Sequence, residues 1–441
     1  MSKVFRPYDP EQTYLMPASL HDWLPQGHLA YFVADVVEHL DLSDIMRRYE
    51  NEERGYPPYH PKMMVKVLLY AYSIGVPSSR KIAKRLQEDI AFRVLAANNT
   101  PDFRTISDFR KEHLKALSAL FLQLLKLCQK AGLVKLGHVA LDGTKIKANA
   151  SKHKAMSYKR MKEEEVRLEA EVKELLKQAE ETDNEEDRQY GKDKRGDELP
   201  GELAFRESRL RKIREAKAAL EAEAKANGEQ KPGNSGEAGG AIPKDKAQRN
   251  FTDPESRIMP VSGGKDFMQA YNAQAAVDSA HQVIVAAETT NQPTDRGQAE
   301  PMMEKVKENT GKLPGQLSAD AGYFSSDAVT NLTAQGIDVY MPPNRILHSD
   351  FVLAAPRGRI PKNLSIVDRM RRKLRTKKGQ KCYALRKELP EPVFGQIKQV
   401  RGFRQFLLRG MEKVSGEWKF ICAGHNLLKL FVARQQGYVI W

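Results

Sequence analysis

The sequence predicts a mixed α/β protein in which an all-helical N-terminal part precedes a sheet-containing core with an inserted helical hairpin. Three observations predict this class. Residues 1–132 carry helix-period apolar patterns, strand-like alternation begins after Gly132, and residues 151–250 return to long heptad-like helices. With 441 residues, the chain is long enough for two or three domains with substantial cores.

The N-terminal part contains three helical patterns. "HPKMMVKVLLYAYSIG" predicts a helix with Pro61 near its start and Gly75 at its end, and "SSRKIAKRLQEDIAFRVLAA" predicts a second helix. A turn at Pro101 then leads into one long helix that ends at Gly132. In a helix–turn–helix arrangement, the outward cations of the second helix suit a DNA backbone, and the solvated face of an ordinary helical bundle is the alternative. These cations are Arg80, Lys81, Lys84 and Arg85.

The insertion has the composition of a helical hairpin followed by a linker. Its two halves place apolar residues at seven-, four- and three-residue steps, which favours an antiparallel helical pair joined by the polar stretch around 181–200. "NGEQKPGNSGEAGGAIPKDK" is typical of a flexible linker. The apolar positions are Met161, Leu168, Val172, Leu175 and Ala179 in the first half, and Leu203, Leu210, Ile213 and Leu220 in the second.

The core alternates strand and helix patterns. "GHVALDGTKIKANA" predicts a strand through Asp142, and residues 266–290 predict a β-hairpin around "DSAHQ". A helix closed by Gly311, the strand "GQLSAD" and the capped helix "SSDAVTNLTAQG" follow. Beyond them, "PEPVFGQIKQVRGFRQFLLRGMEKVSGEWKFICAGHNLLKLF" predicts further helix, with breaks at Gly410 and Gly416.

Composition excludes several classes of protein. No run of about 18 apolar residues predicts a membrane span, and the N-terminus lacks the apolar core of a signal peptide. The three cysteines are far apart, which argues against a disulfide framework or a cysteine-bound zinc and favours the reducing cytoplasm. The expected location is therefore cytoplasmic, at the nucleoid if the partner is DNA.

Positive charge concentrates in one block. The formal net charge is +15, and residues 357–387 contain thirteen lysines or arginines against one acid, Asp368. Such a block repels itself unless a polyanion is near, and nucleic acid is the commonest one. A solvated basic loop is the alternative.

Three acids are candidates for a metal site. The apolar run "LSADAGYFS" stops on Asp320, Asp142 lies within a predicted strand, and Glu391 begins the helix "EPVFGQIK". Two Mg²⁺ ions about 3.5–4 Å apart support in-line attack at phosphorus, and they take oxygen ligands from a few carboxylates on different elements. Each acid also has an ordinary interpretation, as a turn residue, a strand terminator or a helix N-terminal acid. The remaining acids Asp253, Asp278 and Asp295 are predicted to be loop or hairpin-turn residues.

At "YALRKELPEPVFGQIK" the sequence resembles bacterial insertion-sequence transposases of the DDE class, whose helix carries a Tyr-x2-Arg-x3-Glu-x6-Lys signature. Tyr383, Arg386, Glu391 and Lys398 match in type and order. Four residues instead of three separate the arginine from the glutamate, and Glu388 is the nearest alternative. "LDGTKIKANAS" resembles the segment with the first aspartate of the family, and "ADAGYFS" the segment with the second. "PPYHPKMMVKVLLYAYSIGVPSSRKIAKRL", "PDFRTISDFRKEH" and "DPESRIMPVSGGKDFMQAYNAQAAVD" resemble one branch of it.

The resemblance implies an RNase H-like (retroviral integrase-like) core with a mixed five-stranded sheet. It implies a helical DNA-binding domain over 1–132, a catalytic domain over 133–150 and 251–441, and the insertion 151–250. It also implies Mg²⁺, or Mn²⁺ in its place, at Asp142, Asp320 and Glu391. The expected partners are double-stranded DNA, as terminal inverted repeats and target, and a second copy of the chain on that DNA.

Basic and aromatic residues complete the expected site. Arg386 and Lys398 suit phosphate contacts, and Tyr383 suits a phosphate, an unpaired base or simple packing. Lys398 lies seven residues after Glu391, so both should face one side of a helix. His425 and Trp418, also seven apart, are expected in the core. The other expected DNA contacts are Arg80, Lys81, Lys84, Arg371, Arg372 and Lys373.

Two other functions fit the same residues. A non-catalytic DNA-binding protein derived from a transposase would bind terminal repeats without cutting them. An RNase H-like nuclease would cut without joining ends.

Overall fold

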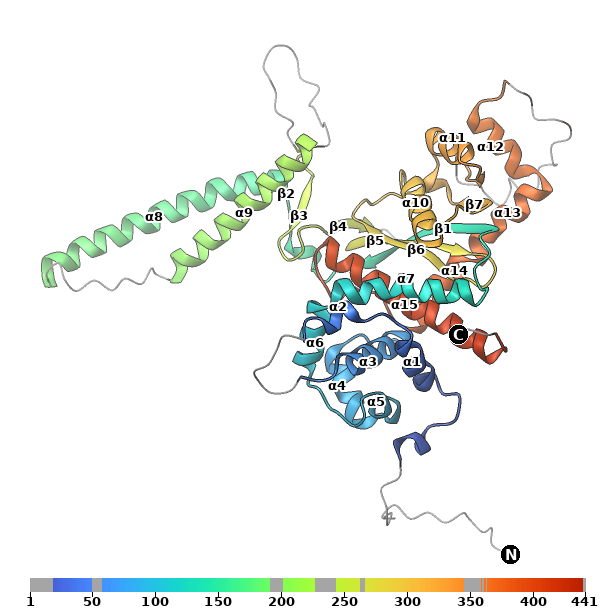
Figure 1. Cartoon of the computed structure of the whole chain (residues 1–441). Helices are drawn as coiled ribbons and strands as arrows, with labels where there is room; N and C mark the ends of the chain where they lie inside the picture. Colours follow the sequence, from blue (N-terminus) through green and yellow to red (C-terminus); the bar gives the residue numbers. More distant parts are fainter. Residues whose placement is uncertain are drawn as a thin grey trace, which may run out of the picture.

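The computed structural model describes residues 19–49, 58–190, 201–226, 243–261, 266–344 and 363–438, together with positions 358 and 361. Figure 1 shows the N-terminal helices on one side of a twisted sheet and a long helical hairpin that projects from the sheet's edge. The predicted mixed α/β class with a helical N-terminal region is confirmed.

The N-terminal helices are shorter than predicted, because two predicted helices are each divided. Asp89 has extended backbone and its side chain accepts from the Ala91 N–H at 2.9 Å, so it begins a new helix within the second pattern. His113 separates two helices in the third pattern. The helices are α1 (Leu29–Glu38), α2 (Ser43–Met46), α3 (Pro61–Ser73), α4 (Ser79–Glu88), α5 (Ile90–Leu95), α6 (Phe103–Glu112) and α7 (Leu114–Lys130), after a 3₁₀ turn (Leu20–Trp23).

The described part of the chain forms one six-stranded mixed sheet with β1 at its centre. On one side, β1 pairs with the antiparallel strand β5, whose far edge is shared by β4 and β6. On the other side, β1 pairs with the parallel strand β7, which in turn pairs with β8. The sequence patterns do not predict strands β4 and β8. The bounds are β1 (His138–Lys147), β4 (Arg257–Pro260), β5 (Phe267–Asp278), β6 (Ile284–Thr290), β7 (Gln316–Ala319) and β8 (Asp338–Tyr340).

Helices follow the strands. The centre of the basic block 357–387 forms helix α12. Met370 and Leu374 lie one turn apart on this helix and are buried, which stabilises it against the rest of the protein. Gly410, at φ +83°, precedes the last helix as predicted, whereas the predicted break at Gly416 is wrong. A Cβ there would lie 3.0 Å from the Leu114 side chain, so Gly416 permits close packing on α7. The helices are α10 (Ala299–Thr310), α11 (Ser326–Ala334), α12 (Ile366–Arg375), α13 (Lys377–Glu388), α14 (Pro390–Gly395), a π-helical turn (Gln396–Val400) and α15 (Met411–Gln435).

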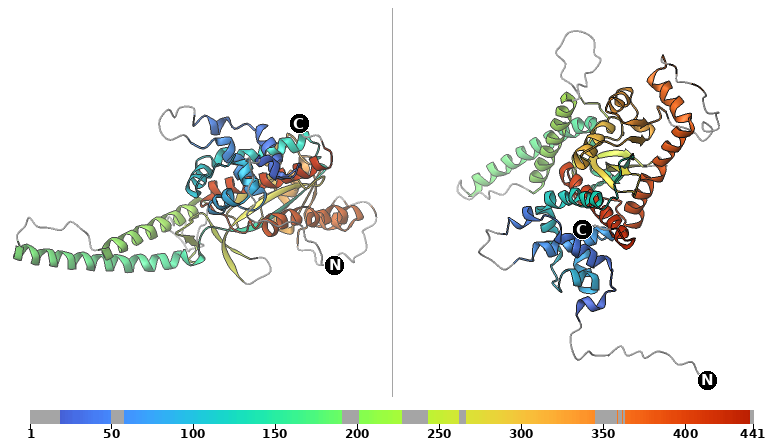
Figure 2. Two further views of the ribbon diagram at one scale, coloured as in Figure 1. Left: turned by 90° about the horizontal axis from the view of Figure 1, so that it is seen from below. Right: turned by 45° about the vertical axis from the view of Figure 1, so that its right-hand side comes forward.

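One buried apolar cluster joins the N-terminal helices to the sheet. Helices α7 and α15 lie between the two parts (Figures 1 and 2), and the Tyr72 ring packs on Phe403 and Phe420 at 5.6 and 4.6 Å. Trp418 and His425 are buried on α15, as expected for core residues. The Nε2 atom of His425 lies 3.0 Å from the Gln282 carbonyl oxygen, and burial lowers the pKa of the imidazole to about 3.

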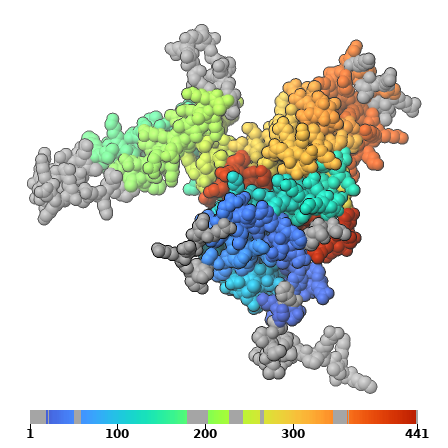
Figure 3. All heavy atoms as spheres, in the orientation of Figure 1, coloured from blue at the N-terminus to red at the C-terminus, as the bar shows by residue number. Residues whose placement is uncertain are grey.

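The insertion begins and ends on a two-stranded sheet of β2 (Ala155–Ser157) and β3 (Gln248–Asn250). Helices α8 (Tyr158–Tyr190) and α9 (Gly201–Ala226) project from it as a pair (Figures 2 and 3). The predicted linker lies mostly outside the described residues. No helix among the described segments has the length and hydropathy needed to span a bilayer. The predicted apolar positions that form the pair's own small core include Met161, Leu168, Leu210, Ile213 and Leu220.

Candidate active site

Asp142 lies in the middle of the central strand. It is half-buried, and its carboxylate accepts from the Gly143 N–H at 2.9 Å. Burial raises the pKa of Asp142 to about 7, and the neighbouring carboxylates of Asp320 and Asp295 add to the increase, while Arg386 opposes it. Burial is therefore the main cause of the raised pKa, and the charge of Arg386 offsets part of it.

Asp320 lies beside Asp142 because of the strand register. Leu141 on β1 pairs with Ala319 on the parallel strand β7, and each aspartate directly follows its paired residue. The Asp320 side chain accepts from the Gly322 N–H at 2.8 Å and so begins a 3₁₀ turn. Two acids 178 positions apart in the sequence therefore lie side by side at the carboxyl end of β7, which we call the sheet edge.

Arg386 connects the third candidate acid to this edge. Its guanidinium lies 3.8 Å from an Asp320 oxygen and 3.5 Å from a Glu391 oxygen, and its side chain is only 16% exposed. Arg386 is on α13 and Glu391 is in the first turn of α14, which begins at Pro390. The side chain of Glu388 makes no such contact with Arg386 within the described residues.

Lys398, in the π-helical turn that follows α14, contacts the central strand β1. Its Nζ donates to Thr144 Oγ1 at 2.9 Å and lies 3.4 Å from the Lys145 carbonyl oxygen. Thr144 and Asp142 share a face of β1, because side chains alternate along a strand. A π-helical turn follows Gly395, so Glu391 and Lys398 do not lie on one regular α-helix.

Tyr383 is on α13, near the carboxylates of Asp320 and Asp142. The guanidinium carbon of Arg386 lies 6.0 Å from the centre of its ring. Burial raises the pKa of its phenol, as do the charges of Asp320 and Asp142. Three of the four signature residues therefore lie around the same acids, and Lys398 joins them through β1.

Asp295, for which the sequence predicts only a loop position, also lies here. Its Oδ1 accepts from Asn272 Nδ2 and Gln274 Nε2, both at 2.7 Å, and lies 3.6 Å from Lys145 Nζ. Gln274 Oε1 in turn accepts from the Tyr323 hydroxyl. The available signal was the pair of amides in "NAQ": two residues apart in an apolar strand, they occupy one face.

The acids have the chemistry of a Mg²⁺ site, but they are not gathered around one point. Carboxylate oxygens are the ligands that Mg²⁺ prefers, and the carboxylates of Asp320 and Asp295 lie close enough to Asp142 to help raise its pKa. In the described part of the chain, no three acidic, histidine or cysteine side chains are close enough to hold an ion as they stand. The guanidinium of Arg386 lies between Asp320 and Glu391.

The remaining predicted DNA contacts lie on two other surfaces. Arg80, Lys81 and Lys84 are on α4, in the N-terminal helical part (Figure 1), where Arg80 lies 5.0 Å from the Phe103 ring centre and Lys84 pairs with Glu88 at 3.6 Å.

The second surface is α12. Arg371 pairs with Asp368 at 3.1 Å, and Arg372 donates to the Gly358 carbonyl oxygen at 3.0 Å. Lys373 points inward to Asp338, the Val339 carbonyl oxygen and the Tyr340 ring.

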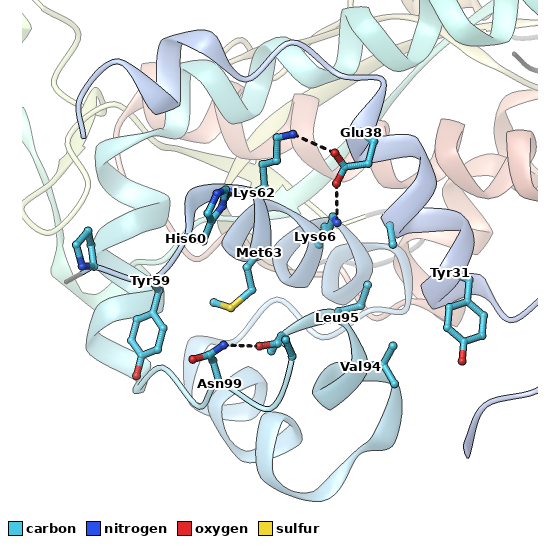
Figure 4. Close-up of a pocket in the computed structure, with 14 residues that line it drawn as sticks. Tyr31, Glu38, Tyr59, His60, Lys62, Met63, Lys66, Val94, Leu95 and Asn99 are labelled. Carbon is cyan, nitrogen blue, oxygen red and sulfur yellow. Dashed lines mark hydrogen bonds and ion pairs between the residues drawn. The ribbon is translucent and has the colours of Figure 1, made fainter. Parts of the chain in front are cut away.

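A cavity of about 940 Å³ opens among α1, α3 and α5, away from these acids (Figure 4). Its one acid, Glu38, is paired with Lys66 at 2.8 Å and Lys62 at 3.0 Å, and these hydrogen-bonded lysines lower the pKa of Glu38 to about 2. With its charge compensated, Glu38 has no environment that would tune it for acid–base chemistry.

Comparison with known families gives two matches. Residues 18–112 match a transposase domain (DUF772), and residues 359–431 match a transposase DDE domain. No curated protein and no solved structure gives a significant match. The first match covers most of the N-terminal helices, and the second covers α12 to α15, including Arg386 and Glu391. The two matches support the resemblance to insertion-sequence DDE transposases.

Proposed function

We propose that the protein is a DNA transposase that binds the terminal inverted repeats of its insertion sequence, cleaves by Mg²⁺-dependent hydrolysis and joins the 3′-OH ends to target DNA. Five strands lie in the order β6-β5-β1-β7-β8, and this order supports an RNase H-like core. In it, β5 is antiparallel to both β1 and β6, whereas β1, β7 and β8 run parallel to one another. The observation that carries the proposal is the convergence of Asp142, Asp320 and the Arg386–Glu391 pair at one edge of that sheet.

In this proposal Asp142, Asp320 and Glu391 would hold the metal ions, and such ions would supply activation of the attacking oxygen and stabilisation of the leaving one. Arg386 and Lys398 contact phosphates beside the scissile bond. Arg386 offers a planar fork of donors, and Lys398 offers a point charge on the face of β1 that carries Asp142. Tyr383 supports Arg386 or contacts an unpaired base. A Cβ placed on Gly395 would meet no atom within 4 Å, so DNA can approach the backbone there.

Binding uses the basic surfaces outside this site. Arg371 and Arg372 on α12 and Arg80, Lys81 and Lys84 on α4 supply phosphate contacts, which give affinity and orientation without reading sequence. Because two transposon ends require two sites, we propose at least a dimer on paired ends. Light scattering that finds one protein for each pair of ends would contradict the dimer.

The test compares single variants on a labelled end fragment. Asp142→Asn, Asp320→Asn and Glu391→Gln should each lower Mg²⁺-dependent nicking about 1,000-fold and leave DNA binding unchanged, since each removes a ligand charge only. Asp327→Asn, an exposed acid in the first turn of α11, is the matched control. Near-wild-type cleavage by any of the three variants would remove that residue from the site.

Two alternatives have distinct outcomes. Terminal-repeat binding without nicking in Mg²⁺ or Mn²⁺ would indicate a non-catalytic DNA-binding protein. Nicking without joined product from a pre-cut 3′-OH end would indicate a nuclease. The two transposase-domain matches favour the transposase over an unrelated nuclease.

A further inference from the structure

The two oxygens of Asp295 have different environments. Oδ1 receives hydrogen bonds from Asn272 and Gln274, both at 2.7 Å, and the ammonium of Lys145 lies 3.6 Å away. Oδ2 accepts no hydrogen bond from any residue that the structure describes. The side chain is 19% exposed. One oxygen is therefore fixed by three donors, while the other is available.

The available oxygen lies near Asp320. A Cβ placed on Gly322 would lie 3.4 Å from Asp295 Oδ2 and 2.9 Å from Asp320 Oδ1, so both oxygens border the same small space. A Cβ placed on Gly143, the residue after Asp142, would lie 2.7 Å from Asp295 Oδ1. Both positions are glycine where Asp295 approaches, and any larger side chain at 143 would displace it.

A second, independent observation is the amide of Asn272. The residue is completely buried, and its Oδ1 has no hydrogen-bond partner within the described residues. This oxygen would lie 2.9 Å from a Cβ on Gly143, beside Asp295. Rotating the amide would set its oxygen against the Asp295 carboxylate, so the orphan acceptor cannot be removed that way. A buried acceptor without a donor marks a missing partner, such as a water on a bound cation.

We propose that Asp295 is a fourth acidic residue of the active site, and that its Oδ2 binds a divalent cation next to Asp320. This rests on the proposed function, because it adds a ligand to the metal site proposed there. Acids that bind metals are typically oriented by hydrogen bonds to their other atoms, which is the role of Asn272 and Gln274 here. Hard oxygen ligands from a fourth element suit Mg²⁺ or Mn²⁺.

The competing explanation is that Asp295 only holds the Lys145 ammonium. The two explanations predict opposite relations between variants. If Asp295 is a ligand, Asp295→Asn weakens cation binding, whereas Lys145→Met removes a competing positive charge and leaves binding equal or tighter. If Asp295 only positions Lys145, the two variants change cation binding alike.

The experiment is a calorimetric Mn²⁺ titration of the full chain without DNA. We expect Asp295→Asn to lower the affinity at one or more sites by at least about tenfold. Asp327→Asn, which removes an exposed charge, should bind as wild type does. Thermal melting of every variant separates lost ligation from lost folding. If Asp295→Asn fails to fold, Asp295→Glu, which keeps the charge but displaces Oδ2, takes its place with the same expectation.

Asp142→Asn makes failure of this inference distinguishable from failure of the proposed function. If Asp142→Asn weakens Mn²⁺ binding and Asp295→Asn does not, the fourth ligand is wrong and the three-acid site stands. Equal effects of Asp295→Asn and Lys145→Met also overturn the inference. If wild type and Asp142→Asn titrate alike, or wild type takes up no Mn²⁺, both the inference and the proposed metal site fail.

Discussion

The cations at the sheet edge and the cations on α4 belong to the same residue types but have different surroundings. Arg386 and Lys398 are half-buried and contact side chains from other elements, at 3.5 Å and 2.9 Å for Glu391 and Thr144. Lys81 and Lys84 are exposed, and Lys84 pairs with Glu88 of its own helix. Sequence spacing does not separate the two groups.

This contrast shows where a charge matters to more than DNA affinity. An exposed pair contributes about 0–1 kcal/mol, since water solvates both partners almost as well when the pair is broken. A half-buried cation next to acids compensates charge that water screens only in part, so its removal alters those acids as well. The α12 helix has both kinds: exposed Arg371 and inward-pointing Lys373. Four experiments test this contrast.

The largest effect is expected at Arg386. Arg386→Met leaves Asp320 and Glu391 facing each other without the cation that now contacts both, and removes a proposed phosphate contact. Loss of its charge-assisted bonds should slow single-turnover nicking about 100-fold. Arg386→Lys keeps the charge but lacks the planar guanidinium, so its nicking rate should lie between those of the wild type and the methionine variant. Equal rates for the lysine and methionine variants would show that the charge at 386 is unimportant.

A smaller effect is expected on the outer face of α12. Arg371→Ala with Arg372→Ala should weaken binding to end DNA roughly tenfold and lower the salt slope by about 2, since each phosphate contact releases about one counterion. The measurement is fluorescence anisotropy over a range of salt concentrations. An unchanged slope would mean that these arginines make contacts within the protein, such as those with Asp368 and Gly358, and not with phosphates.

Lys373 should act on folding rather than on DNA. Burial disfavours ionised Asp338, but its bonds to Lys373, Tyr340 and Lys378 outweigh that and lower its pKa. A lowered pKa gives stability that is complete above the ordinary value near 3.8 and is lost as pH falls below it. Lys373→Met should therefore cost about 1 kcal/mol at pH 7 and progressively less below pH 4. The check is urea unfolding at several pH values.

The contrast would be broken if Lys373→Met left stability unchanged at pH 7 but lowered the salt slope of DNA binding. Lys373 would then behave like Arg371. Lys378→Met, whose ammonium is more exposed and lies 3.0 Å from the same carboxylate, is the matched control and should cost less.

The smallest effect is expected on α4. Lys81→Ala should weaken DNA binding roughly two- to threefold, lower the salt slope by about 1 and leave the melting temperature unchanged. No effect on DNA binding would favour the ordinary solvated face over a DNA-binding helix. A large drop in melting temperature would contradict the exposure of this residue in the structure.

Local pattern predicts much of this fold. The spans of α3, β1, the β5–β6 hairpin and α10 follow from periodicity and from the residues that end them, such as Gly311 at φ +84°. The patterns fail where tertiary contacts decide: a helical face continues through Asp89, but the backbone turns there. Strand β8 escapes prediction because three residues are too short to establish a period.

The site is predictable in part. The resemblance selects Asp142, Asp320 and Glu391, and the structure brings the first two together by register and the third through Arg386. The sequence does not mark Asp295 as a site residue, because a loop acid carries no period. Only its contacts with Asn272 and Gln274 reveal where it lies.

Sequence alone settles most of the longer helices and strands, where positive charge accumulates and which family the chain resembles, because these depend on neighbouring residues. Which charges are buried and which acids meet depends on the tertiary fold, because pairing β1 with β7 joins residues almost 180 positions apart. Burial and proximity change what a carboxylate or an ammonium does, and neither is a property of local sequence.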